Sequence, residues 1–265
     1  MADHTTYGLV CSELSEDLSK TNLGELKLDS FQDNSVKIKI KAASLNFPDL
    51  LMTQGKYQNR PDLPFALGME GAGIVEKVGS GVSSFKEGDE VMFGGWGHGA
   101  IAESIILPES LVSLKPKSLN FSEAASFKTA YLTAYVGLIR RGELKQGETL
   151  LVHGASGGVG MAAVQMGKLY GAKVIASGTS DEKLKIVKTW GADEIINTGL
   201  EGSVSFREEV KELTDGKGAD VIYDPVGGDV FDESIRCINW GGRLLIIGFT
   251  SGRIPTVPVN YPLIK

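Results

Sequence analysis

Hydrophobic residues follow two different periods along the chain, and the change of period divides it. Up to about residue 118, short apolar runs alternate with polar positions and are separated by glycine turns. In the segment 36–42, Val36, Ile38 and Ile40 alternate with three lysines, which predicts a strand with one buried and one solvated face. Similar strands are predicted at 71–78 and after 85–91. Many short strands with regular turns predict a barrel-like β domain.

From the helix expected at 122–139, which Ser122 is expected to cap, helical and buried-strand patterns alternate, so we expect domains at 1–120 and 121–265. Buried strands are predicted at 149–153, 173–177, 194–197, 220–226 and 243–249, and helices at 159–170, 180–190, 203–213 and 231–240. This order predicts an α/β fold with a doubly wound parallel sheet. The proline-rich segment 254–265 predicts neither a further helix nor a sixth strand, which leaves an open sheet edge.

Composition narrows the functional class. The 265 residues are 42% hydrophobic and 23% charged, which is typical of a globular protein. No run of about 18 apolar residues predicts a membrane helix, and a net charge of −6 gives no basic surface for nucleic acid. Cys11 and Cys237 are too few for a disulfide framework, and the first residues carry no secretory signal pattern. We therefore expect a cytoplasmic protein that binds neither membranes nor nucleic acid.

The segment 150–160 carries the strongest chemical signal, because a buried strand runs into a glycine turn and then a helix. Gly157 and Gly158 let the backbone approach a diphosphate, Gly160 lets the helix pack closely, and the helix N-terminus presents free amides to the anion. Ala155 stands where the usual G-x-G-x-x-G pattern has its first glycine. An ordinary glycine-rich turn is therefore the alternative interpretation.

The end of the second predicted strand indicates which dinucleotide binds. An acidic residue there would bind the ribose 2′-hydroxyl of NAD, but Ser177 and Thr179 leave room for a 2′-phosphate and Lys183 follows as a cation. This favours NADPH. Asp181 and Glu182 lie next to these residues and weaken the inference, unless they serve as first-turn charges of the following helix.

The histidines and cysteines do not form a pattern that binds zinc. His4, His98 and His153 are scattered, and the cysteines are far apart in the sequence. We expect no metal site, a packed or hydrogen-bonded imidazole at His153, and a surface-loop histidine at His98, with a substrate-facing His98 as the alternative.

Several further motifs occur together in one order. They lie at 44–49, 55–57, 64–75, 78–82, 129–135, 224–228 and 248–252. With the glycine loop, they make the chain resemble the zinc-free quinone oxidoreductases of the medium-chain dehydrogenase/reductase superfamily. The resemblance implies a GroES-like N-terminal domain, a Rossmann C-terminal domain and NADPH in the cleft between them. Met69 occupies the place of a zinc-binding histidine in zinc-dependent relatives, and Thr198 replaces a common tyrosine.

The resemblance also implies roles for individual residues. Asn46 and Tyr57 are expected at the nicotinamide and substrate pocket, with Asn46 donating to the developing oxyanion and Tyr57 as a second donor. The remaining residues expected to bind the cofactor are Thr129, Ser156, Gly157, Gly158, Val159, Ser177, Thr179, Lys183, Val226, Gly248 and Phe249.

The implied activity is hydride transfer from NADPH to a quinone or an α,β-unsaturated carbonyl without zinc. The alternatives are an enoyl-CoA reductase and an inactive protein that binds NADPH. Family members continue with a strand, a helix and a final edge strand that pairs in a homodimer. We therefore expect a C-terminally truncated chain whose Rossmann sheet lacks its last edge strand.

Overall fold

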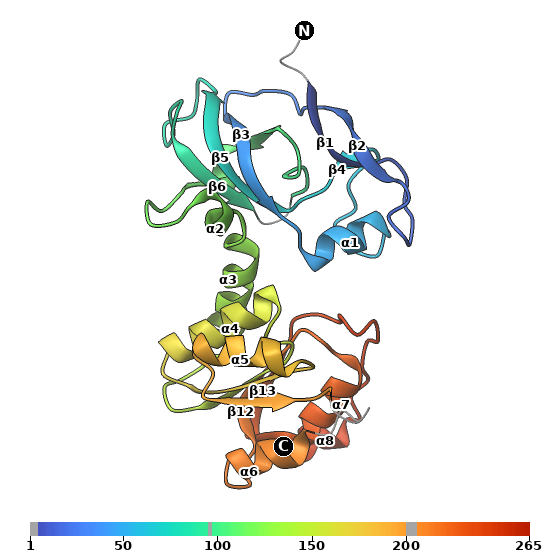
Figure 1. Ribbon diagram of the computed structural model, residues 1–265, viewed down its shortest axis with the longest axis vertical. Coiled ribbons are helices and arrows are strands. Elements are labelled where there is room, and N and C mark those ends of the chain that lie inside the picture. The colour runs from blue at the N-terminus through green and yellow to red at the C-terminus, as the bar shows by residue number, and fades with distance from the viewer. Residues whose placement is uncertain (1–4, 95–96, 200–205) are drawn as a thin grey trace. The chain divides into compact units, whose positions relative to one another are not determined.

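The computed structural model describes residues 5–94, 97–199 and 206–265 (Figure 1). The chain folds into two compact units, Met1–Thr129 and Ala130–Lys265. This division falls inside the segment 122–139, where we expect the helix that opens the second domain, and the predicted boundary between residues 120 and 121 stays a prediction. Within the described ranges, no helix has both the length and the apolar character needed to cross a bilayer.

The first unit, blue to green in Figure 1, contains two antiparallel sheets. The larger has the order β7-β3-β5-β6-β8, formed by Ser104–Pro108, Ser35–Ser44, Glu70–Val78, Glu90–Gly94 and Val112–Leu114. The smaller has the order β2-β1-β4, formed by Thr21–Lys27, Thr5–Cys11 and Phe65–Ala66. The first unit also contains helices α1 (Phe47–Thr53) and α2 (Phe121–Ala125) and the short 3₁₀ helix η1 (Glu109–Leu111). Helix α3 (Lys128–Tyr135) follows α2.

The alternation predicted for the segment 36–42 is confirmed in β3. Val36 and Ile38 are buried in a core shared with β5, β6 and β7, whereas Lys39 and Lys41 are exposed. Gly73 on β5 lies against this strand so closely that a Cβ there would come 2.2 Å from the carbonyl oxygen of Lys39. The close pairing of β3 and β5 therefore requires a glycine on β5.

The second unit is built on a parallel sheet of the order β11-β10-β9-β12-β13. The strands are β9 (Thr149–Val152), β10 (Lys173–Gly178), β11 (Glu194–Asn197), β12 (Ala219–Asp224) and β13 (Ile238–Ile246). The helices are α4 (Gly158–Leu169), α5 (Asp181–Thr189), α6 (Arg207–Leu213), α7 (Gly228–Cys237) and α8 (Asn260–Ile264), preceded by a π-helical turn η2 (Val136–Arg141). The predicted α/β fold is confirmed. The strand order reverses between β9 and β12, the position where doubly wound folds bind ligands.

Both faces of this sheet are covered by helices, as the continuous apolar runs predict. Leu150 and Val152 of β9 lie in one core with α4 and α5, and Leu151 lies in the other core with α6 and α7. A strand this short thus contributes to two cores because successive side chains point to opposite faces.

The single helix predicted at 122–139 was wrong in detail. Asn120 rather than Ser122 caps the start, since its side chain accepts from the N–H of Glu123. Helix α2 then ends at Ala125 and α3 begins at Lys128. After α3, residues Val136–Arg141 continue as the π-helical turn rather than as α-helix.

Two predictions near the C-terminus were also wrong. The helix expected at 231–240 ends at Cys237, because the chain pairs with β12 from Ile238 onward and Gly241 takes a left-handed φ of 70°. Helix α8 forms despite the prolines. Pro262 lies in its first turn, where a missing N–H costs no intrahelical hydrogen bond. Residues 203–205 of the helix predicted from Ser203 lie outside the described residues.

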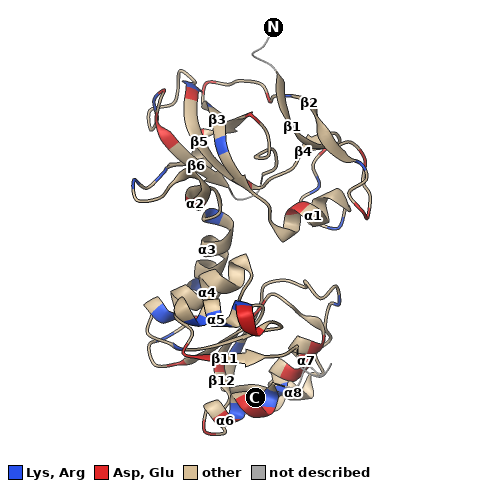
Figure 2. Ribbon diagram, viewed as in Figure 1, with Lys and Arg blue, Asp and Glu red and all other residues tan. Residues whose placement is uncertain are grey.

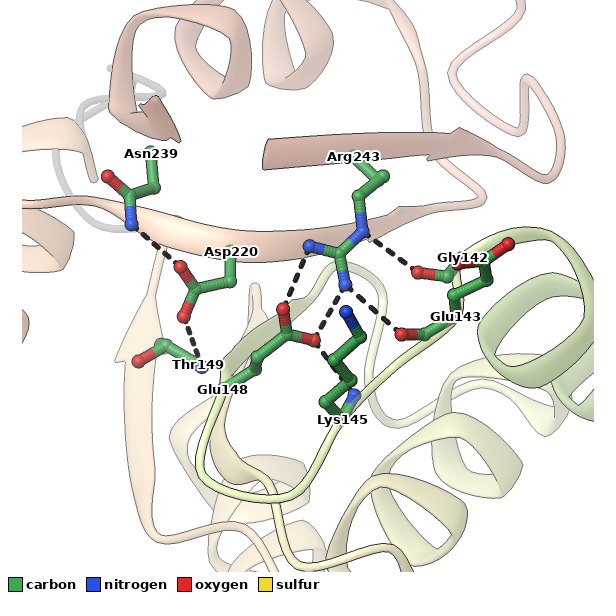
Figure 3. A network of polar contacts seen from close by, with 8 residues as sticks. All are labelled: Gly142, Glu143, Lys145, Glu148, Thr149, Asp220, Asn239 and Arg243. Carbon is green, nitrogen blue, oxygen red and sulfur yellow. Dashed lines mark hydrogen bonds and ion pairs between the residues drawn. The ribbon is translucent and has the colours of Figure 1, made fainter. Parts of the chain in front are cut away.

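A polar network holds the amino ends of three strands together (Figure 3). The Arg243 guanidinium donates to both carboxylate oxygens of Glu148 (2.6 and 2.9 Å) and to the Gly142 carbonyl oxygen (2.8 Å). Beside it, Asp220 accepts from the N–H of Thr149 (2.8 Å) and from Asn239 Nδ2 (2.7 Å). The bidentate pairing of Arg243 with Glu148 is geometrically specific. The network fixes the edge of the sheet at which these strands begin, opposite to the edge at which they end.

His153, the residue after β9, is packed and hydrogen-bonded, as expected. Ser234 donates to the Val230 carbonyl oxygen (2.7 Å), so its hydroxyl accepts from His153 Nε2 (2.8 Å). Because a neutral imidazole has one donor, Nδ1 accepts from the Ser177 hydroxyl (2.6 Å). The ring also lies 4.8 Å from that of Phe206. The network thus defines one neutral tautomer of His153.

This buried histidine predicts acid sensitivity. Burial lowers the pKa of His153 from 6.5 to about 3, so between these pH values the unfolded chain binds a proton at His153 and the folded chain does not. The contribution of the neutral imidazole to the free energy of unfolding is complete above pH 6.5 and is lost as the pH falls from 6.5 toward 3. Between about pH 7.5 and about pH 5.5, the free energy of unfolding should fall by about 1.4 kcal/mol more in the wild type than in His153→Gln.

Urea denaturation of both proteins at the two pH values measures this difference. The other titrating groups are common to both proteins and cancel. An equal loss of stability in the two proteins on acidification would contradict the assignment.

Candidate functional site

The loop after β9 turns sharply before α4 begins. Gly154 takes the left-handed conformation with φ 54°. Ala155 is fully buried and its N–H donates to the Ser177 carbonyl oxygen (3.0 Å), while the Gly157 N–H donates back to Gly154 (2.9 Å). The glycine that makes the turn is therefore Gly154. Alanine at position 155 causes no strain there, which explains the departure from the usual pattern.

Two glycines of this loop differ in how closely other protein atoms approach them. A Cβ on Gly160 would lie 2.3 Å from the Gly154 carbonyl oxygen, so close packing of α4 on the loop excludes any side chain there. A Cβ on Gly158 would meet no protein atom within 4 Å. Gly158 is exposed at the first turn of α4, a helix of 12 residues, and its φ is not left-handed. Nothing in the chain itself demands a glycine at position 158.

The open space over Gly158 fits a phosphate-bearing ligand. Ser156, Gly157 and Gly158 are all exposed, and the N-terminal amides of α4 have no intrahelical partners. A helix N-terminus with room for close backbone approach is how proteins hold a diphosphate. The residues present therefore fit a dinucleotide, with Val159 half-buried behind them.

At the end of β10 the predicted residues separate into two groups. Ser177 is 2% exposed and its hydroxyl donates to His153, so this side chain belongs to the core and does not lie at the surface where a phosphate would bind. Thr179 and Lys183 are exposed. Asp181 lies in the first turn of α5 and accepts from Asn197 Nδ2 (2.7 Å).

The loops after β12 and β13 hold each other. Asp224 Oδ1 accepts from the N–H groups of Val226 (2.8 Å) and Gly227 (2.9 Å). Burial raises the pKa of Asp224, and these two hydrogen bonds oppose that rise. From the β13 side, the N–H of Ser251 donates to the Val226 carbonyl oxygen (3.0 Å). Phe249 lies against Gly227, where a Cβ would come 3.0 Å from its ring. Val226 and Phe249 are thus brought together.

An ion-pair cluster attaches the loop after β13 to α7. Arg253 donates to Asp229 (2.8 Å) and to Asp232, and its carbonyl oxygen accepts from the N–H of Gly228 (3.1 Å). Gly248 packs against Pro225, whose carbonyl oxygen would lie 3.3 Å from a Cβ there.

In the first unit, a buried carboxylate gathers the expected residues. Glu70, which is 1% exposed, accepts from Ser44 Oγ (2.7 Å) and Asn46 Nδ2 (3.0 Å) through Oε1, and from the Thr129 N–H (2.8 Å) through Oε2. Asn46 and Thr129, which are far apart in the sequence, are therefore bound to one side chain. Sequence reasoning missed Glu70. The available signal was an acidic residue inside the apolar segment 64–75.

The expected donation from Asn46 to a substrate oxygen does not agree with this arrangement. Asn46 Nδ2 donates to both Ser44 Oγ (3.1 Å) and Glu70 Oε1 (3.0 Å). A side-chain amide has two N–H groups. Both are used within the chain, so Asn46 has no N–H left for an oxyanion.

Other charged groups surround Glu70. Asp49 accepts from the N–H groups of Asn46 (2.7 Å) and Gly68 (3.0 Å). Burial raises the pKa of Asp49, and the Glu70 charge adds to that rise. Burial lowers the pKa of Lys128, and the charge of Glu70 opposes that fall.

Over the described helices and strands, acidic and basic positions are interspersed (Figure 2).

Tyr57 and Met69 belong to an apolar cluster with Phe65. Tyr57 is partly buried, and Met69 is 6% exposed. His98 is not a fully exposed loop residue, since its ring lies 5.6 Å from that of Phe65 and burial lowers its pKa. In the part of the chain that the structure describes, no three His, Cys, Asp or Glu side chains lie close enough to hold a metal ion.

The second unit, whose strand order reverses beside the exposed N-terminus of α4, has a fold of the Rossmann type, a class in which dinucleotides bind at this position. Family models agree: residues 32–117 match the alcohol dehydrogenase GroES-like domain, and residues 158–265 match the zinc-binding dehydrogenase family. The chain belongs to the quinone oxidoreductases of the medium-chain dehydrogenase/reductase superfamily, of the zinc-free type.

Individual relatives support this placement. The quinone oxidoreductase-like protein 2 homolog of Nematostella vectensis is 39% identical over 97% of this chain and 69% of its own length. The quinone oxidoreductase of Pseudomonas syringae pv. Tomato DC3000 superposes with a TM-score of 0.90 at 34% identity, covering 97% of this chain and 78% of that one.

Two further structures are informative about ligands. Escherichia coli quinone oxidoreductase complexed with NADPH has a TM-score of 0.86 at 32% identity and covers 97% and 76% of the two chains. The CurK enoyl reductase has a TM-score of 0.85 at 30% identity and covers 97% and 77%.

Alanine at position 160 and alanine at position 158 should affect the stability of the protein to different degrees. Gly160→Ala should destabilise the protein by about 1–3 kcal/mol, because its Cβ meets a backbone oxygen that cannot easily move. Gly158→Ala is the matched control, because its added Cβ meets open space. Its free energy of unfolding should stay within about 0.5 kcal/mol of the wild-type value. Thermal unfolding by circular dichroism measures both. Equal melting temperatures for the two variants would refute the close-packing argument.

Proposed function

We propose that this oxidoreductase uses NADPH to reduce a quinone or an α,β-unsaturated carbonyl without a metal ion. The observation that carries the proposal is the open space over Gly158 at the N-terminus of α4, where the strand order of the sheet reverses. NADPH would supply a hydride, that is, two electrons and one proton, and leave as NADP⁺. The family membership of the chain and the NADPH complex of its E. coli relative support this cofactor.

Each part of the cofactor has candidate partners. The amides of Ser156 to Val159 would hold the diphosphate. Thr179, just after β10, and Lys183, in the first turn of α5, are both exposed and would bind the 2′-phosphate. Asp181, which a 2′-phosphate would repel, is bound to Asn197.

Residues at other strand ends and in the first unit are proposed to contact the nicotinamide half. Val226, Gly248 and Phe249 lie on the two loops that hold each other after β12 and β13. Asn46 and Thr129 are held by Glu70.

The acceptor needs little acid–base help from the protein. A quinone that takes up a hydride becomes a hydroquinone anion, whose oxygen is protonated by water, so orientation is the main task of the site. Tyr57 is proposed as the hydroxyl donor to the acceptor oxygen.

The cytoplasmic location and the homodimer stay predictions.

An enoyl reductase is the second candidate, favoured by the structural similarity to CurK. NADPH oxidation measured at 340 nm against quinones, free enones and enoyl-CoA esters separates the two. We expect turnover with quinones and enones and much slower turnover with the CoA esters. Preference for a CoA ester would select the second candidate. Quenching of tryptophan fluorescence by NADPH with no turnover of any acceptor would indicate a non-catalytic binding protein.

Lys183 provides a test of the cofactor. Lys183→Ala should raise the dissociation constant for NADPH roughly tenfold, since it removes a charged partner of the 2′-phosphate, and leave that for NADH unchanged. Isothermal titration calorimetry measures both. Lys185→Ala, which removes an exposed lysine from the same helix, is the control for loss of charge. The proposal of NADPH fails if Lys183→Ala weakens both nucleotides equally or neither.

A further inference from the structure

The hydrogen bonds around Glu70 have a fixed direction. Ser44 has one hydroxyl hydrogen and donates it to Glu70 Oε1 (2.7 Å). Its oxygen therefore accepts from Asn46 Nδ2 (3.1 Å), whose other N–H goes to Glu70 Oε1 (3.0 Å). The reversed amide would set its oxygen against the carboxylate. Electrostatics thus allow one orientation of the Asn46 side chain.

In this orientation Asn46 offers an acceptor. Asn46 and Asp49 form a capping box at the start of α1, in which the Asn46 side chain faces the Asp49 backbone. A carbonyl oxygen has two lone pairs, so Oδ1 keeps one for a ligand even when the other faces α1. The remaining hydrogen-bonding capacity of this partly buried side chain is that of an acceptor only.

We propose that Glu70 is a positioning residue that sets the polarity of Asn46, so that Asn46 recognises an N–H or O–H donor on the nicotinamide riboside half of the cofactor rather than the acceptor's oxygen. This inference rests on the proposed function. The reacting oxygen of a quinone or an enone accepts hydrogen bonds, and the Asn46 oxygen would repel it. A nicotinamide riboside carries donors, namely its ribose hydroxyls and its carboxamide N–H groups.

Glu70→Gln reverses this polarity with little change of shape. The Thr129 N–H, which donates to Glu70 Oε2 (2.8 Å), would hold the oxygen of the introduced amide. Its nitrogen would then face Ser44 and Asn46, and the Asn46 amide would turn to accept from it. Asn46 would present N–H groups to a donor on the cofactor.

Binding of two ligands measures the effect. Glu70→Gln should raise the dissociation constant for NADPH on the order of tenfold. It should leave unchanged that for adenosine 2′,5′-bisphosphate, which lacks the nicotinamide riboside. Glu76→Gln removes the same charge from the same strand at a more exposed position and is the control. A merely structural role for Glu70 would weaken both ligands.

A double variant supplies a rescue. Asn46→Asp alone places two carboxylates together and should also weaken NADPH. In Asn46→Asp/Glu70→Gln, the introduced amide donates to the introduced carboxylate and to Ser44, and Thr129 keeps its acceptor. The three hydrogen bonds among positions 44, 46 and 70 are present with reversed direction, the bond from Thr129 keeps its direction, and an acceptor again faces the ligand. The double variant should bind NADPH within about threefold of the wild type.

The polarity can also be followed without ligand. In nuclear magnetic resonance spectra, the Asn46 side-chain N–H signals, identified by their loss in Asn46→Asp, should exchange slowly in the wild type and faster in Glu70→Gln. Slow exchange in both proteins, equal NADPH binding in both, or a double variant no better than the single ones would overturn the inference. Failure of the wild type to bind NADPH would refute the proposed function instead, and the exchange rates would still decide the role of Glu70.

Discussion

Parallel pairing of β9 with β10 and β12 is the constraint on which the second unit depends. Parallel strands end at one edge of a sheet, so the loops that follow β9, β10, β12 and β13 emerge together. The polar network of Arg243, Glu148 and Asp220 lies at the opposite edge. The network of Arg243, Glu148 and Asp220 and the candidate binding groups are therefore separated by the length of the strands.

The first unit depends on a different constraint, the burial of the carboxylate of Glu70. A buried carboxylate is costly unless its oxygens accept hydrogen bonds. Glu70 receives them from three residues in two segments of the chain, and each donor is thereby fixed in position and direction. The same requirement acts on His153, where two serines complete a neutral imidazole. In both cases satisfying one buried group determines what its neighbours can offer a ligand.

Periodicity predicted most of the fold, because strands β9 to β12 and helices α4 and α5 bury regular apolar faces. It failed where pairing or capping decided the outcome: Asn120 displaced Ser122 as a cap, and pairing with β12 ended α7 early. The glycine loop was predictable, since its geometry is local. The Ser177 hydroxyl and the Asn46 amide were misjudged because their partners, His153 and Glu70, are distant in sequence. A residue type indicates which hydrogen bonds are available, but only the fold shows which are already used.

The clusters that hold the loops differ in how they respond to the solution. The turn after β9 is closed by backbone hydrogen bonds and close packing at Gly160, which dissolved ions do not screen. The loop that carries Phe249 is attached to α7 through the exposed ion pairs of Arg253 with Asp229 and Asp232. Exposed ion pairs weaken as salt shortens the range of their attraction. Ionic strength therefore loosens the loop after β13 while the turn after β9 keeps its shape, so the two halves of the proposed nucleotide would meet surfaces of unequal stiffness.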